Sequence, residues 1–279
     1  LGGIPVYIEN DANAAAKAEA MAGAAKGSRS SVMITLGTGV GGGIILDGKV
    51  YAGFNFAGAE LGHTVIEKDG RQCSCGRRGC WETYSSATGL VVTTKEKILA
   101  CRAKKIPTLM EKLICGDLTR ISGKTAFTAA KHNDKAGREV VNQYIDYLAC
   151  GIANMINIFQ PEVVCIGGGV SKQGETLLAP IRAYVDAEDY ARSNAQRTRI
   201  VCAELFNDAG IVGAAMLGKQ GIIPAEDSEK IVEGLKNILA EIDAGTLEID
   251  MTSEDIHTFV EGELTRRIGD AGKRLHTAR

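Results

Sequence analysis

Net charge, proline and long apolar runs are all scarce in this sequence, and each scarcity excludes a class of protein. The 32 Lys and Arg residues nearly cancel the 34 Asp and Glu residues, so nucleic acid is not expected as a partner. The longest uncharged apolar stretch, residues 32–46, is too short for a membrane-spanning helix and carries five glycines, so no membrane partner is expected. The hydrophobic content of 45% is typical of a globular protein.

Cysteine is present without the signs of secretion. No signal peptide opens the chain, so the 8 cysteines predict reduced thiols or a metal site in a cytoplasmic protein. The first residue is Leu1 and not Met, and we therefore interpret the chain as a fragment or a processed product.

Strands and helices alternate up to about residue 220, which predicts an α/β fold. We expect strands at residues 4–8, 32–36, 44–46, 49–51, 162–166 and 199–204, and helices at 12–25, over most of 85–159 and at 207–218. The segment 37–43 is expected to form a glycine turn, and residues 55–81 an irregular loop.

The character of the chain changes after Gly221. Two helices are predicted, at residues 227–243 and at about 254–268, and the first has an apolar stripe. Two such helices cannot build a core by themselves. The stripe is therefore expected to stay exposed and to favour self-association.

One loop contains four potential metal ligands, His63, Cys73, Cys75 and Cys80. One imidazole and three thiolates are the ligands of a closed, tetrahedral, structural zinc site. The glycines between the cysteines allow the tight turns that bring the three sulfur atoms together. Free thiols or a disulfide are the alternative interpretation.

Two further features indicate phosphate and proton chemistry. Gly37, Thr38 and Gly39 follow a strand, and such a turn can hold phosphate with its backbone N–H groups, although an ordinary hairpin has the same pattern. A strand follows this turn where a dinucleotide-binding loop needs a helix. Asp11 lies between a predicted strand and a helix, where its carboxylate could accept a proton from a substrate hydroxyl or cap the helix.

Six motifs together resemble the ROK family of sugar kinases, and most closely its bacterial glucokinases. They are residues 9–13, 36–43, 58–63, 73–82, 166–171 and 208–210. The resemblance implies an actin-like ATPase fold of the RNase H-like α/β class, truncated at its N-terminus, with sugar and ATP in an interdomain cleft. It also implies ATP, Mg²⁺ and a structural Zn²⁺ as cofactors, and pairing of subunits into a homo-oligomer.

The resemblance assigns a role to each motif. Asp11 would be the catalytic base on the sugar 6-hydroxyl, and the other hydroxyls would be held by Asn10, Glu60, His63 and Glu82. The ATP phosphates would face Gly37, Thr38 and Gly39, and the adenosine would face Gly167, Gly168 and Gly169. The zinc ion bound by His63 and the three cysteines would order the loop that presents Glu60.

The function implied is ATP-dependent phosphorylation of a hexose. Glucose is the first candidate, and mannose and N-acetylated sugars remain open. The family's first phosphate motif, Asp-x-Gly-Gly-Thr, is absent from the chain together with the small N-terminal domain, so we expect impaired activity. A sugar-responsive transcription repressor of the same family is the alternative, which the intact pair Asn10 and Asp11 disfavours.

Residues 216–279 resemble a second family, the N-terminal region of argininosuccinate lyase. The resemblance is carried by residues 216–223, 230–235, 254–257 and 275–279. The catalytic serine loop of that family is absent, so this segment is not expected to perform the elimination. Residues 216–220 fit both families, and our hypothesis is a chimaera with a kinase-like domain at 1–220 and a helical segment at 221–279.

Overall fold

The computed structural model describes residues 11–55, 57–205, 225–247, 256–269 and 271. The chain forms two compact units, one made of Gly27–Ala203 and the other of Leu1–Lys26 together with Glu204–Arg279. The predicted strand at 4–8 and the predicted helix at 207–218 lie outside the described residues. Within the part described, no helix combines the length and apolarity that crossing a bilayer requires.

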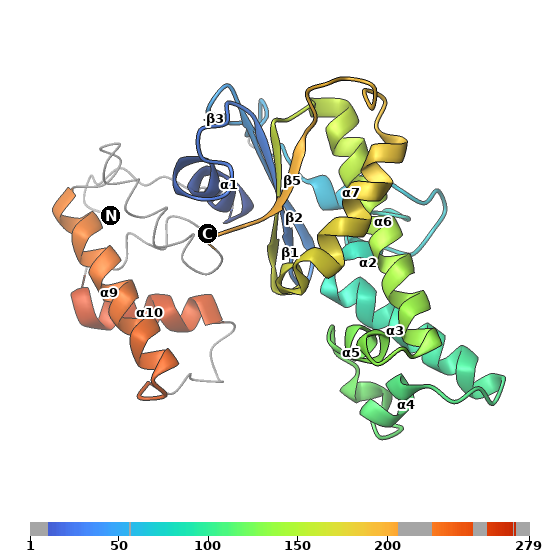
Figure 1. Cartoon of the computed structure of the whole chain (residues 1–279). Coiled ribbons are helices and arrows are strands. Elements are labelled where there is room, and N and C mark those ends of the chain that lie inside the picture. Colours follow the sequence, from blue (N-terminus) through green and yellow to red (C-terminus); the bar gives the residue numbers. More distant parts are fainter. Residues whose placement is uncertain (1–10, 56, 206–224, 248–255, 270, 272–279) are drawn as a thin grey trace. The chain divides into compact units, whose positions relative to one another are not determined.

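The unit Gly27–Ala203 is built on a five-stranded sheet in the order β3-β2-β1-β4-β5 (Figure 1). Its strands are β1 (Ser31–Leu36), β2 (Val40–Leu46), β3 (Lys49–Val50), β4 (Val163–Gly168) and β5 (Arg199–Cys202). The hairpin strands β1, β2 and β3 pair antiparallel, whereas β1, β4 and β5 pair parallel. Strands β1 and β4 are almost entirely buried apolar runs, as expected for the centre of a covered parallel sheet.

Two strands extend further into the glycine segments than the sequence predicts. Strand β2 begins at Val40 and includes three of the glycines that we expected in the turn, and β4 continues through Gly168. The glycines in β2 make room for a neighbouring side chain. A Cβ atom on Gly42 would overlap the side chain of Leu61. Leu61 is the first residue of a short 3-10 helix, η1 (Leu61–His63), which packs against β2. The glycines in β2 therefore permit close approach.

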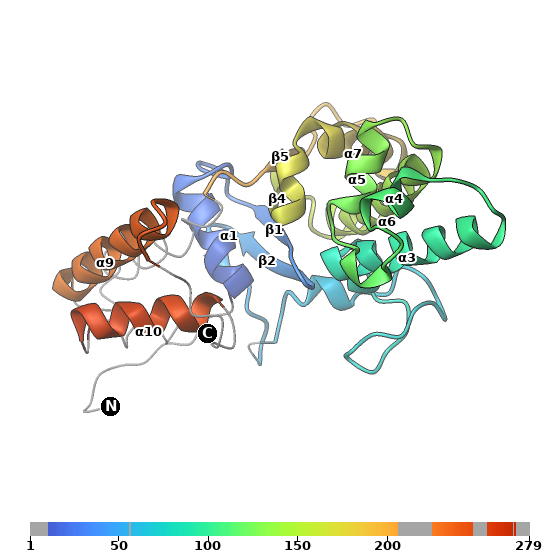
Figure 2. The same ribbon diagram turned by 90° about the horizontal axis from the view of Figure 1, so that it is seen from below.

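Helices cover one face of this sheet. They are α2 (Glu82–Ser85), α3 (Ala87–Ala103), α4 (Leu109–Leu113), α5 (Thr125–Lys131), α6 (Lys135–Phe159) and α7 (Glu175–Glu188). Figures 1 and 2 show α6 and α7 side by side on that face. Helix α6 begins at the N-cap Asp134, whose carboxylate accepts a hydrogen bond from the Gly137 N–H at 2.7 Å. Its apolar side supplies much of the core, including Leu148, Ile152 and Ile156.

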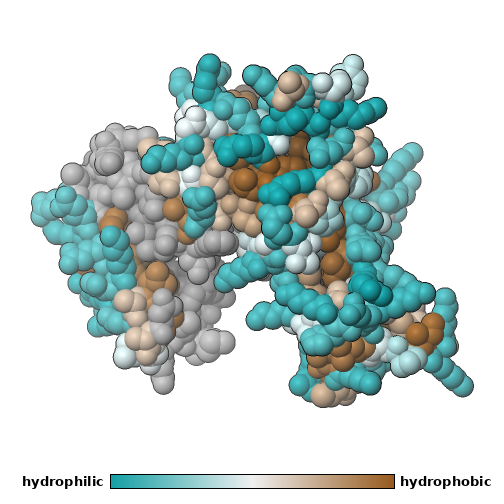
Figure 3. Space-filling view, viewed as in Figure 1, coloured by the Kyte–Doolittle hydropathy of each residue, from teal (hydrophilic) through white to brown (hydrophobic). Residues whose placement is uncertain are grey.

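The second unit contains α1 (Asp11–Ala22), α9 (Ala225–Asp243) and α10 (Ile256–Ile268). The expectation that the apolar stripe stays exposed is wrong, because α10 packs against it. Ile231 and Ile238 of α9 are 1% exposed, and Leu264 of α10 is 0% exposed. The outward side of α9 is hydrophilic (Figure 3).

The buried carboxylate of Glu19 in helix α1 is hydrogen-bonded to the backbone of the segment 204–205. The Glu19 residue is 1% exposed, and its side chain accepts hydrogen bonds from the N–H groups of Ala24 at 2.8 Å and Leu205 at 2.8 Å. A third bond comes from the Glu204 N–H at 3.2 Å. The helix therefore has a fixed attachment to the segment 204–205 of its own unit.

Candidate functional site

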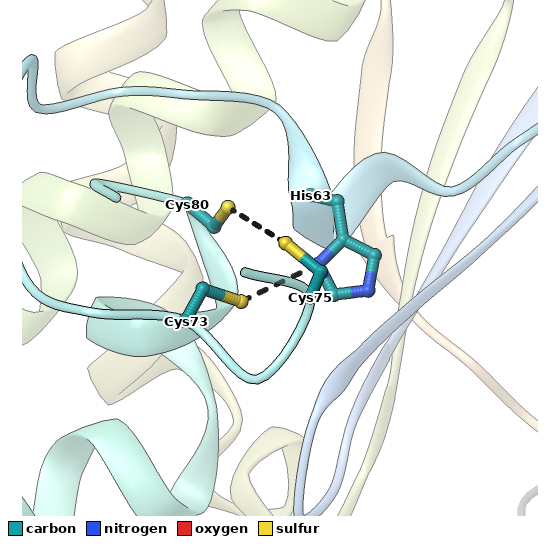
Figure 4. A group of neighbouring side chains, drawn as sticks. All are labelled: His63, Cys73, Cys75 and Cys80. Carbon is teal, nitrogen blue, oxygen red and sulfur yellow. Dashed lines mark hydrogen bonds between the residues drawn. The ribbon is translucent and has the colours of Figure 1, made fainter. Parts of the chain in front are cut away.

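The structure brings His63, Cys73, Cys75 and Cys80 together, as the sequence predicts. Their ligand atoms all lie within 4.8 Å of one another. Nδ1 of His63 lies 3.6 Å from Sγ of Cys73, and the sulfur atoms of Cys75 and Cys80 are 3.7 Å apart (Figure 4). That sulfur separation is well beyond a disulfide bond length, and all four groups are free to act as ligands.

Local backbone geometry shapes this loop. Gly79 has φ +77°, and a Cβ atom there would overlap the carbonyl oxygen of Glu67, so only glycine fits. Short antiparallel bridges pair Val65 with Cys80 and Gln72 with Arg78. The glycine spacing in the sequence therefore encodes the turns that gather the sulfur atoms.

Two of the three thiols, those of Cys75 and Cys80, differ in exposure and in pKa. The Arg77 backbone N–H lowers the pKa of the exposed Cys75 thiol. Burial raises the pKa of Cys80 to about 12, and the neighbouring Cys75 thiol adds to this effect. A cation bound by these sulfur atoms would stabilise the thiolate forms, which are the forms that bind zinc. The donor set of one nitrogen and three sulfur atoms fits a closed zinc site.

An arginine that sequence analysis did not identify anchors the loop. The Arg71 guanidinium donates to Thr83 O at 3.1 Å, to Thr93 Oγ1 at 3.0 Å and to a Glu96 carboxylate oxygen at 2.6 Å. It also lies 4.9 Å from the centre of the Tyr84 ring. No local pattern distinguishes this arginine from its neighbours, since its partners lie 12 to 25 residues further along the chain.

The single tryptophan of the chain lies between this loop and the core. Trp81 is completely buried, and its indole N–H donates to the carbonyl oxygen of Tyr147 at 3.0 Å. A Cβ atom on Gly151 of α6 would overlap the indole ring. Trp81 therefore joins the loop rigidly to α6, and its fluorescence can report on this region.

The glycine segments at 37–39 and 167–169 lie side by side at the C-terminal ends of β1 and β4. Strands β1 and β4 are parallel neighbours, and their last paired residues are Leu36 and Gly168. Gly168 has φ +88°, and a Cβ atom there would overlap the Leu36 carbonyl oxygen. The exposed residues Gly37 and Thr38 follow directly after Leu36. This juxtaposition of two glycine-rich strand ends is the geometry expected of a phosphate-binding edge.

The predicted sugar-binding residues are distributed over both units. Glu60 is exposed just before η1, His63 is half-buried at its end, and Glu82 opens α2, all within the unit Gly27–Ala203. Asn10 lies outside the described residues. Asp11 is the first residue of α1, in the other unit.

Comparison with known proteins identifies the family to which the sequence is similar. The sequence matches the ROK family over residues 2–221. It is 41% identical to a glucokinase of Halalkalibacterium halodurans over 218 residues, which make up 78% of this chain and 64% of that protein. The chain thus spans somewhat less than two thirds of the length of this relative.

Two solved structures are similar to the chain. A ROK family glucokinase from Streptomyces griseus, in complex with glucose and AMPPNP, is 37% identical with a TM-score of 0.69, and the match covers 78% of this chain and 69% of that one. A ROK family transcriptional regulator, a homologue of the Mlc protein of E. coli, is 32% identical with a TM-score of 0.66, and the match covers 79% and 53% of the two chains. These likenesses confirm the predicted α/β fold of the actin-like ATPase class.

Proposed function

The chain belongs to the ROK family, and from this premise we propose that it transfers phosphate from ATP to a hexose, with glucose as the first candidate. The observation that carries the proposal is the meeting of the glycine ends of β1 and β4, together with the packing of η1, which ends at His63, against β2. A phosphate-binding edge and a set of hydroxyl-binding side chains are the two halves of a sugar kinase site.

Each predicted residue has a distinct task in this proposal. The sugar hydroxyls are held by Asn10, Glu60, His63 and Glu82. Asp11 accepts the proton of the attacking 6-hydroxyl. Nδ1 of His63 faces the sulfur atoms, and its other ring nitrogen points away from them (Figure 4). That second nitrogen therefore carries the proton and can donate to a sugar oxygen. Gly37, Thr38 and Gly39 face the ATP phosphates, and Gly167–Gly169 face the adenosine.

Two metal ions belong to the proposal. Zn²⁺ is held by His63 and the three cysteines, and it fixes the loop that presents the sugar-binding side chains. Mg²⁺ bound with ATP offsets charge on the phosphates during transfer.

The proposal also concerns the organisation of the chain. Residues 1–220 form the kinase-like domain, and 221–279 form a helical segment that resembles the N-terminal region of argininosuccinate lyase. The family match ends at residue 221, which supports this boundary. A homo-oligomer is proposed from the family resemblance.

A sugar-responsive transcription repressor is the second candidate. The likeness to a ROK transcriptional regulator favours it, since such a protein needs a sugar site but no catalytic base. The acidic residue Asp11 at the start of α1 distinguishes the two candidates, because only the kinase requires its carboxylate.

The test is sugar-dependent release of ADP by the purified, zinc-loaded chain. Glucose, mannose and N-acetylated hexoses are compared at equal concentrations, and glucose is expected to give the fastest release. Asp11→Asn should lower the rate by on the order of 100-fold or more while sugar binding persists. Sugar binding by the wild-type chain with neither ADP release nor binding of Mg²⁺-AMPPNP would refute the kinase and favour the repressor.

A further inference from the structure

One carboxylate connects the metal loop to the glycine turn. Glu82 follows directly after Cys80 and Trp81, and its Oε2 atom accepts a hydrogen bond from the Val40 N–H at 3.1 Å. Its Oε1 atom lies 4.0 Å from Sγ of Cys73. A Cβ atom on Gly39 would overlap Oε2, so the carboxylate packs directly against the turn. Glu82 thus contacts both parts of the proposed site.

Residues at the start of α3 hold the turn between β1 and β2. The carbonyl oxygen of Gly37 accepts from the Ala87 N–H at 2.9 Å, and that of Thr38 accepts from Thr88 Oγ1 at 2.8 Å. Both donors belong to the first turn of α3. With the bond from Val40 to Glu82, the residues of α2 and α3 fix both ends of the turn.

Two backbone donors of the turn have no partner among the described residues. They are the N–H groups of Thr38 and Gly39, whereas the Gly37 N–H bonds to the Gly39 carbonyl oxygen at 3.1 Å. Successive free N–H groups in a turn form a concavity that binds anions such as phosphate. The direction of these two donors depends on where the backbone enters β2, which is where Glu82 holds Val40.

We propose that Glu82 is a positioning residue for the nucleotide. Its carboxylate fixes the start of β2 and thereby aims the N–H groups of Thr38 and Gly39 at the ATP phosphates. A carboxylate suits this role because a hydrogen bond to a charged acceptor is stronger than a neutral one. The inference rests on the proposed function and deepens it, since it makes a residue of the sugar-binding set part of the nucleotide site.

The test measures nucleotide binding in the absence of sugar. Mg²⁺-AMPPNP is titrated into the zinc-loaded chain and its affinity is measured by calorimetry. Glu82→Ala is expected to weaken this affinity on the order of tenfold, and Glu82→Gln, which keeps an acceptor oxygen, to weaken it less. Glu60→Gln serves as the contrast, because an exposed carboxylate outside the turn should change sugar affinity and leave nucleotide affinity as it is.

A second measurement does not depend on any ligand. Hydrogen exchange of the Val40 amide should be slow in the wild-type chain and much faster in Glu82→Ala, with unchanged zinc content and Trp81 emission showing that the loop is intact. Equal exchange in both proteins, or an effect of Glu82→Ala on sugar affinity alone, would overturn the inference. If the wild-type chain binds sugar but no nucleotide, the kinase proposal fails, and the exchange experiment still decides whether Glu82 holds the turn.

Discussion

Truncation of the buried carboxylate of Glu19 should strongly destabilise the unit that contains α1. In Glu19→Ala the three N–H donors of Ala24, Glu204 and Leu205 lose their common acceptor. A hydrogen bond to a charged group contributes about 1.5–3 kcal/mol, and a buried donor left unsatisfied costs about 1–3 kcal/mol. Counting only the two bonds at 2.8 Å, each contributing about 1.5–3 kcal/mol, the expected loss is about 3–6 kcal/mol. Glu19→Gln retains one acceptor oxygen and should lose about half as much.

The assay is equilibrium unfolding in urea, followed in parallel by far-ultraviolet circular dichroism and by Trp81 fluorescence. Trp81 belongs to the other compact unit, so the two signals show whether the units unfold together. Glu229→Ala, on the exposed side of α9, is the matched control and should change the free energy of unfolding by less than about 0.5 kcal/mol. A loss below about 1 kcal/mol in Glu19→Ala would refute the reasoning, because it would mean that the three bonds are dispensable.

Three further predictions concern other parts of the chain. Gly168→Ala should destabilise the sheet by about 2–4 kcal/mol, because its Cβ atom would meet the Leu36 carbonyl oxygen at a positive φ; an unchanged melting temperature would contradict this. Bonding to Arg266 and also to Arg267 lowers the pKa of Glu263 from 4.5 to about 2, so its stabilising effect is complete above pH 4.5 and disappears as the pH falls toward 2. Helicity measured between pH 5 and pH 2 should therefore change less in Glu263→Gln than in the wild-type chain. Chelation of zinc should shift Trp81 emission to longer wavelength as the loop loosens, and an unshifted spectrum would show that the loop keeps its structure without zinc.

Features encoded by neighbouring residues were predicted correctly. The positions of β1, β3 and the helices between residues 85 and 159 follow from local apolar patterns and turn residues. The gathering of His63 with the three cysteines follows from their spacing within one loop and from glycines that permit its turns. The family resemblance predicts one functional region for the two glycine segments, and the parallel pairing of β1 with β4 brings them together.

The errors at the glycine segments and at the tail have a common cause. Gly42 looks like part of a turn in the sequence, yet it lies in strand β2. The Leu61 side chain occupies the space that a side chain at position 42 would need. The apolar stripe of α9 looks unpartnered, yet α10 covers it. In both cases the deciding neighbour is not adjacent in the chain, and an apolar or glycine pattern does not say which surface it will meet.

The sequence by itself determined the fold family, the donor set of the metal loop and the chemistry available at each motif, because side-chain type and short-range spacing carry that information. Only the tertiary structure decided which groups meet. Val40 and Glu82 are 42 residues apart, and Glu19 and Leu205 are 186 residues apart. Such contacts depend on strand pairing and on how helices pack onto the sheet, which arise from the cooperative burial of the whole core and not from any local segment.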